Sequence, residues 1–120
     1  DLPRKSLGRE VTLQRDTENI FEIMDILKDL SKEVEEMLQE EKLSGRTVTL
    51  KLKYDDFTSI TRQQSLGKCI DSGKIIFEAA SGLLKKTEAG KRKVRLVGVS
   101  VSGFPPVHDD KGPVQLTFPF

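Results

Sequence analysis

A chain of 120 residues is long enough for one domain whose core needs neither disulfides nor metal. Hydrophobic residues make up 36% and charged residues 32%, a globular balance, and no apolar run reaches transmembrane length, so we expect no membrane partner. One cysteine, Cys69, and one histidine, His108, exclude an internal disulfide and a Cys/His zinc site, and they favour a reducing, cytoplasmic compartment.

The charges are unevenly distributed, although their sum is only +1. Of the 20 bases and 19 acids, residues 18–41 hold two bases and nine acids, so 18 bases and 10 acids lie elsewhere. This separation suggests an acidic surface facing water and another surface for a polyanion. The alternative is a solvated acidic helix beside ordinary surface lysines. The N-terminus has no signal-peptide pattern and no initiator Met, so we expect a fragment of a larger protein.

The first third of the chain predicts a strand and a long helix. Residues 5–13 alternate apolar and polar side chains, except that Arg9 takes an apolar position, and they predict a strand. Asn19 followed by Glu22 resembles a capping box. From Ile20 to Leu38 apolar residues recur at three- and four-residue steps, which predicts an amphipathic helix with an acidic outer face. Ser44-Gly45 should end that helix.

The clearest strand covers residues 46–54. One side of it should face a core, with Val48, Leu50, Leu52 and Tyr54. The other side should be basic and rich in hydroxyl groups, with Thr47, Thr49, Lys51 and Lys53. Asp55-Asp56 predicts a turn, and residues 57–66 predict a polar strand. We interpret Tyr54 and Phe57 as residues at the edge of the core.

The remaining elements are a second helix, a last strand and a linker. Asp71 or Ser72 should cap a helix with a buried apolar stripe that ends near Gly90. Residues 94–101 predict a β-branched strand interrupted by Gly98. Residues 103–113 are rich in Pro, Gly and Asp and predict a linker.

The element order is therefore βαββαβ, an α+β fold. Right-handed crossovers place both helices on one face of a four-stranded sheet and leave the other face open. An open, basic face that carries hydroxyl groups can dock on phosphates.

Catalytic groups are scarce. The pairs Asp55-Asp56 and Asp109-Asp110 fit turns better than a two-metal site. Residues 67–74 superficially resemble a phosphate-binding loop, but the glycine spacing is one residue too long and Ile75 replaces the metal-binding hydroxyl. We therefore predict no catalytic residue, no metal site and no cofactor in this chain.

Two further segments suggest binding. Six bases within eleven positions suggest a phosphate-facing patch, although lysines there could merely offset a helix C-terminus: Lys85, Lys86, Lys91, Arg92, Lys93 and Arg95. In the last six residues, Leu116, Phe118 and Phe120 alternate with Thr117 and Pro119. This pattern favours an extended peptide that fills pockets on a partner, and the alternative is a strand end packed back on the domain.

Several of these segments together resemble one known family. Residues 4–13, residues 49–57 with 61–66, and residues 94–101 resemble the opening, the central hairpin and the last strand of the little-finger domain of Y-family translesion DNA polymerases, of the bacterial DNA polymerase IV type. Residues 115–120 resemble the clamp-binding peptide of these polymerases, with departures to Phe at two positions and to Pro between them.

The resemblance implies a non-catalytic domain that grips the phosphates of primer–template DNA without reading sequence, and that is tethered to a sliding clamp. Residues 1–104 would form the DNA-binding domain, 105–114 a flexible linker and 115–120 the clamp-binding peptide. The expected DNA contacts are Arg4, Lys5, Ser6, Arg9, Lys51, Lys53, Thr61, Arg62 and Arg95. The expected clamp contacts are Gln115, Leu116, Phe118 and Phe120. Leu96 and Ser100 depart from basic residues of some relatives.

The parent chain would be a DNA polymerase whose magnesium-binding carboxylates lie in an upstream palm domain, and this fragment would be a monomer. An RNA-recognition module is a second possibility, but it would carry aromatic side chains on its central strands. A ligand-binding regulatory domain of ferredoxin-like fold is a third, and it would leave the basic face and the tail unexplained.

Overall fold

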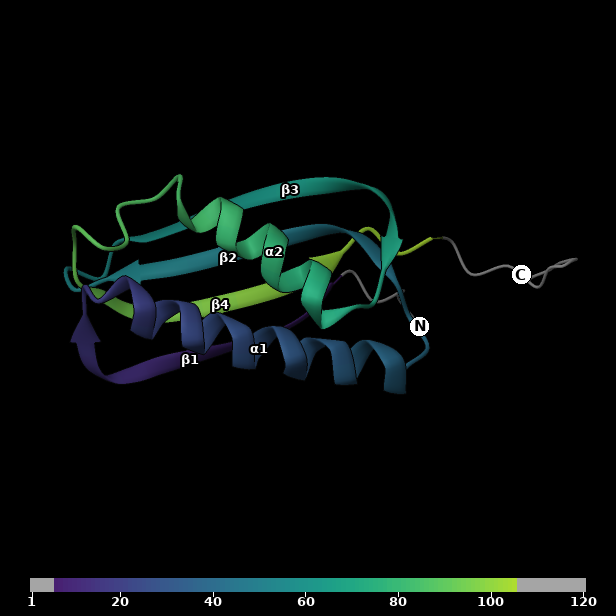
Figure 1. The fold of residues 1–120 in the computed structure, drawn as a ribbon, viewed down its shortest axis with the longest axis horizontal. Coiled ribbons are helices and arrows are strands. Elements are labelled where there is room, and N and C mark those ends of the chain that lie inside the picture. The colour runs from purple at the N-terminus through teal and green to yellow at the C-terminus, as the bar shows by residue number, and fades with distance from the viewer. Residues whose placement is uncertain (1–5, 106–120) are drawn as a thin grey trace, which may run out of the picture.

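The structure, a computed structural model, describes residues 6–105 and confirms the predicted order of elements (Figure 1). The elements are β1 (Ser6–Thr17), α1 (Ile20–Glu40), β2 (Gly45–Tyr54), β3 (Ser59–Ile70), α2 (Gly73–Leu84) and β4 (Val94–Ser102). The predicted fold class, an α+β fold with a four-stranded sheet and two helices, is confirmed.

The four strands form one sheet in the order β1-β4-β2-β3, and every neighbouring pair is antiparallel. Each helix connects two strands that are separated by one other strand. Helix α1 packs over β1 and β4, and helix α2 packs over β2 and β3. Both helices cover the same face of the sheet (Figure 1), so the opposite face has no covering layer in the part of the chain that is described.

The core lies between the helices and the sheet, as the alternation in β2 predicts. Leu50 and Leu52 are no more than 1% exposed. They pair across the sheet with Val99 and Val97, which are 2% and 0% exposed. The helices contribute buried side chains along one stripe each: Ile23, Leu27, Val34 and Leu38 from α1, and Ile76, Ala80, Leu83 and Leu84 from α2.

Helix α1 begins as the sequence predicts but ends earlier. The side chain of Asn19 accepts hydrogen bonds from the backbone N–H groups of Phe21 and Glu22, which confirms the cap. The helix ends at Glu40, because Lys42 adopts a left-handed conformation with φ 58°. The prediction that Gly45 ends the helix is wrong. Gly45 opens β2, where a side chain would collide with the carbonyl oxygen of Ser102.

Other boundaries also differ. Strand β1 continues past residue 13 to Thr17, with a register shift after Thr12, and β3 runs to Ile70, so the loop-like residues 67–70 belong to a strand. Helix α2 ends at Leu84, whose carbonyl accepts from the Thr87 hydroxyl at 2.6 Å. Gly98 does not interrupt β4, because strand pairing uses only its backbone.

Candidate nucleic-acid interface

Four rows of side chains cross the uncovered face of the sheet, each with one residue from β1, β4, β2 and β3 in that order. The rows are Ser6–Ser102–Thr47–Ser65, Gly8–Ser100–Thr49–Gln63, Glu10–Gly98–Lys51–Thr61 and Thr12–Leu96–Lys53–Ser59. Residues directly opposite one another on paired strands share a face, so this surface consists mainly of hydroxyl groups, glycines and two lysines. Its one large apolar side chain, Leu96, is only 6% exposed.

No aromatic side chain belongs to these rows. Tyr54, at the end of β2, points into the core and is 2% exposed. The central strands β4 and β2 therefore offer no platform on which bases could stack, and this argues against an RNA-recognition module.

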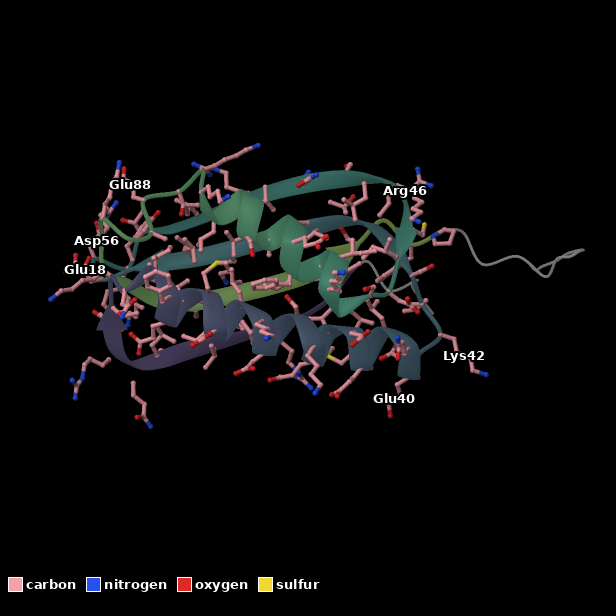
Figure 2. The ribbon with its side chains drawn as sticks, in the orientation of Figure 1. Glu18, Glu40, Lys42, Arg46, Asp56 and Glu88 are labelled. Atoms are coloured by element: carbon pink, nitrogen blue, oxygen red, sulfur yellow. The ribbon has the colours of Figure 1, made fainter. Side chains whose placement is uncertain are left out.

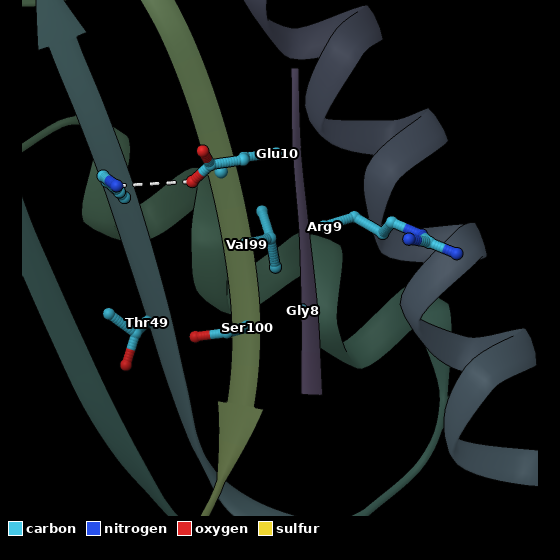
Figure 3. A pocket seen from close by; sticks show the side chains of 8 residues that line it. Gly8, Arg9, Glu10, Thr49, Val99 and Ser100 are labelled. Carbon is cyan, nitrogen blue, oxygen red and sulfur yellow. Dashed lines mark hydrogen bonds and ion pairs between the residues drawn. The ribbon is translucent and has the colours of Figure 1, made fainter. Parts of the chain in front are cut away.

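A groove of about 280 Å³ lies on this face over β1, β4 and β2 (Figure 3). Its lining residues are Gly8, Arg9, Glu10, Thr49, Lys51, Gly98, Val99 and Ser100. At Gly8 an added Cβ would lie 2.6 Å from the Cβ of Ser100, so the floor of the groove is backbone rather than side chain. Lys51 Nζ lies 3.3 Å from Glu10 Oε1 across the groove. A sugar–phosphate chain could approach this floor closely, with Lys51 at its side.

The turn between β2 and β3 is bound to the connection between α2 and β4. Arg92 lies 4.1 Å above the centre of the Tyr54 ring and pairs with Asp56 at 2.9 Å and with Glu88 at 3.6 Å. Asp56 and Glu88 occupy the same end of the molecule (Figure 2). The Tyr54 hydroxyl accepts from the backbone N–H of Glu88 at 3.0 Å. These contacts fix the position of the β2–β3 turn against the α2–β4 connection.

The pKa of Asp56 is lowered from its ordinary value of 3.8. The main cause is the backbone N–H of Thr58, which donates to the carboxylate at 3.0 Å, and the charge of Arg92 adds to it. The carboxylate is therefore ionised at neutral pH. Arg92, which is part of the predicted phosphate-facing patch, pairs with Asp56 and Glu88 and lies over the Tyr54 ring.

Beside this turn, Phe57 is 60% exposed, so its interpretation as a residue at the edge of the core is wrong. Arg95 lies 4.4 Å from the centre of its ring and Lys53 Nζ lies 5.9 Å away. Arg95 also pairs with Asp16 Oδ1 at 3.6 Å. The register shift between Lys53 and Tyr54 falls opposite Arg95.

The structure brings only part of the predicted DNA contacts onto one face. Ser6, Lys51, Lys53 and Thr61 belong to the four rows. Arg95 lies at their end, beside Phe57.

Two predicted contacts lie on the helix side of the edge strands instead. Arg9 pairs with Val99, and its Nε lies 3.6 Å from Glu33 Oε1 of helix α1, toward which it points (Figure 3). Arg62 pairs with Leu50, and its Nη1 donates to the carbonyl oxygen of Thr61 at 2.8 Å.

Some predictions fall outside the described residues. These are the DNA contacts Arg4 and Lys5, the clamp contacts Gln115, Leu116, Phe118 and Phe120, and nearly all of the linker at 105–114.

Sequence reasoning also missed several residues of the face. Ser100 and Ser102 could have been found by extending the period-two alternation of β4. Gly8 and Gly98 could not, because their role depends on which strands pair, and that is set by tertiary structure.

Within residues 6–105, no three His, Cys, Asp or Glu side chains gather as a metal site would require. Neither helix of this part is long and apolar enough to cross a membrane. Cys69 is half-buried.

The fold and this face define a class: an antiparallel α+β domain with two helices on one side of its sheet and an uncovered polar surface on the other. The chain matches the impB/mucB/samB family C-terminal domain over residues 4–118. It belongs to that family and is a little-finger domain of a Y-family DNA polymerase.

Curated relatives agree with this assignment. The chain is 44% identical to DNA polymerase IV of Alkalilimnicola ehrlichii over 108 residues, which cover 90% of this chain and 30% of that protein. It is 40% identical to DNA polymerase IV of Clostridium perfringens over 99 residues, which cover 82% of this chain and 28% of that protein. The chain thus spans less than a third of these relatives.

Solved structures share the fold. A complex of the β-clamp processivity factor with the little finger domain of PolIV matches with a TM-score of 0.70 and 26% identity, over 96% of this chain and 99% of that one. The insertion ternary complex of Dbh DNA polymerase matches with a TM-score of 0.68 and 22% identity, over 82% of this chain and 28% of that one. The second likeness shows the fold alone.

Proposed function

We propose that the uncovered sheet face grips the sugar–phosphate backbone of primer–template DNA without reading its sequence. The observation that carries this proposal is the composition of the four rows. The other face of the sheet carries apolar side chains, whereas the rows carry hydroxyl groups, glycines that expose the backbone, and the two lysines Lys51 and Lys53. Phosphate contacts of this kind fix position and give affinity that falls with salt.

The charge distribution also favours the approach of DNA from the uncovered side of the sheet. Helix α1 is rich in acids and lies on the opposite side of the sheet from the rows, so its charges would repel a polyanion from the helix side. The family assignment and the DNA polymerase IV relatives support DNA as the polyanion.

We also propose that residues 115–120 bind a bacterial sliding clamp. The support is the resemblance of Gln115-Leu116-Thr117-Phe118-Pro119-Phe120 to a clamp-binding peptide, together with the likeness to a little finger domain that was solved in complex with a β-clamp. A tail held by the clamp would raise the local concentration of the DNA-binding face near the primer–template.

The parent protein, in this proposal, is a cytoplasmic translesion DNA polymerase whose magnesium-dependent active site lies outside this domain. The domain would hold primer–template DNA while the catalytic part works, so no chemical step is assigned to residues 6–105.

The DNA-binding proposal is tested by titrating labelled duplex DNA at 50 mM and at 200 mM salt and following fluorescence anisotropy. The double variant Lys51→Ala/Lys53→Ala should bind more weakly, and the slope of log affinity against log salt should fall by about 2. The matched control is Lys28→Ala/Lys32→Ala on α1, which removes the same charge from the helix side. Equal losses in both double variants would contradict an assignment to the open face.

The clamp proposal is tested by titrating the chain and a version truncated after Val114 into a bacterial sliding clamp. Saturable binding that is lost on truncation is expected. Binding that survives truncation, or no binding by either chain, would remove the tail from the proposal and leave DNA binding by the sheet unaffected.

A further inference from the structure

Phe57 occupies a backbone conformation that suits glycine. Its backbone N–H donates to the carbonyl of Tyr54 at 2.9 Å, and the N–H of Tyr54 donates to the carbonyl of Thr58 at 2.9 Å, so the residues between them form a three-residue hairpin loop. In such loops the last residue is left-handed and is usually Gly. Phe57 has φ 70°, which is strained for a bulky side chain.

Burial of the ring in the core does not offset this strain. Phe57 is 60% exposed, whereas Tyr54, three residues earlier, is 2% exposed. Residues held in strained backbone conformations cluster at active sites and ligand-binding sites, where the strain can hold a side chain ready for a partner.

The surroundings of the ring indicate which partner. Arg95 lies 4.4 Å and Lys53 5.9 Å from the ring centre, and Lys53 belongs to the open face. Proteins that bind single-stranded nucleic acid combine an exposed aromatic ring, on which a base stacks, with nearby cations that meet the phosphates, and Phe57 with its two cationic neighbours offers both.

Bases inside a duplex are already stacked on their neighbours and cannot stack on this ring as well. The acids nearby reduce the positive charge only partly: Asp16 pairs with Arg95, and Asp56 is held by Arg92 on the side of the α2–β4 connection. Lys53 stays on the open face next to the ring.

We propose that Phe57, with Lys53 and Arg95, binds an unpaired base where a single strand continues beyond the duplex gripped by the open face. This inference rests on the proposed DNA-binding function and adds a contact with single-stranded nucleic acid. The positively charged neighbours favour a nucleic acid over an apolar protein surface as the occupant.

The experiment uses Phe57→Trp, which supplies a reporter at the site, since the chain contains no Trp. The variant is titrated with three duplexes: one with blunt ends, one with an overhang of unpaired thymines, and one with an abasic overhang that carries the same phosphates. We expect quenching and tighter binding with the thymine overhang, and neither effect with the abasic one.

Two alanine variants distinguish a specific contribution of the Phe57 ring from non-specific binding by exposed aromatic side chains. Phe57→Ala should bind the duplex with the thymine overhang at least about fivefold more weakly than the wild type does, which is the effect of losing one stacked base. Its affinity for the blunt duplex should not change. Phe21→Ala removes another exposed aromatic, 78% exposed on α1, and should change neither. Phe57→Gly should lose the overhang effect yet unfold no earlier than the wild type, because Gly relieves the strain.

The outcomes distinguish this inference from the function on which it rests. Binding of the blunt duplex with equal affinity for both overhangs overturns the inference and leaves the proposed function standing. Failure to bind the blunt duplex overturns both. A marked destabilisation by Phe57→Gly would assign the ring a structural role and overturn the inference, as would a protein partner that quenches Phe57→Trp where no oligonucleotide does.

Discussion

The two faces of strand β2 differ in burial and in polarity. Val48, Leu50, Leu52 and Tyr54 are no more than 2% exposed under the helices, whereas Thr47, Thr49, Lys51 and Lys53 remain partly exposed on the other side. Burial of apolar area stabilises a fold, and the uncovered face buries little of it. The helix face therefore determines stability, and the open face is available for binding at small cost to folding.

The largest effect should come from the helix face. Leu50→Ala removes a side chain that is 1% exposed and leaves a cavity, so we expect a loss of about 2–5 kcal/mol in the free energy of unfolding. Thr49→Ala, next to it on the open face, is the control and should cost far less. Urea unfolding of both variants measures the difference, and equal losses would break the distinction between the faces.

A smaller loss is expected where two strands approach closely on the open face. In Gly8→Ala the new Cβ would lie 2.6 Å from the Cβ of Ser100 and 2.7 Å from the carbonyl oxygen of Val99. We expect a destabilisation of about 1–3 kcal/mol from overpacking. Gly67→Ala in β3 is the control, since nothing lies within 4 Å of its added Cβ. Thermal unfolding compares them, and a neutral Gly8→Ala would show that β1 can shift away from β4.

The arginines of the edge strands test where the DNA-binding face ends. Lys51→Ala should lower the salt slope of DNA binding by about 1, as expected for one phosphate contact. Arg9→Ala and Arg62→Ala should leave the slope unchanged, because both residues lie on the helix side. Anisotropy titrations over a range of salt concentrations decide this. A slope lowered equally by Arg9→Ala would show that DNA wraps around the edge at β1.

The smallest effect concerns Asp56. Because its pKa in the folded state is lowered, the ionised carboxylate stabilises the fold above its ordinary pKa of 3.8, and this contribution is lost as the pH falls through the folded value. Asp56→Asn should therefore melt below the wild type near pH 6, and the difference between the two melting temperatures should shrink as the pH falls below 3.8. Melting curves across this range provide the measurement, and a difference that is constant with pH would exclude this linkage.

Much of the fold could be predicted because its cause is local. The alternation in β2, the three- and four-residue spacing in α1 and the cap at Asn19 each depend on residues close in sequence. The candidate face was predicted in part for the same reason: Lys51 and Lys53 follow from the alternation of one strand. Arg9 also followed that alternation, which put it with Leu7 on the buried side, yet the family resemblance named it as a DNA contact.

The sequence by itself determined the order of elements, the two faces of β2 and the polar character of one of them, because side chains alternate along an extended chain. The tertiary structure decided the strand order β1-β4-β2-β3, and with it which residues form the rows of the open face. It also decided that Phe57 stays exposed beside Arg95 and Lys53. Contacts between strands distant in sequence set these features, and no local pattern contains them.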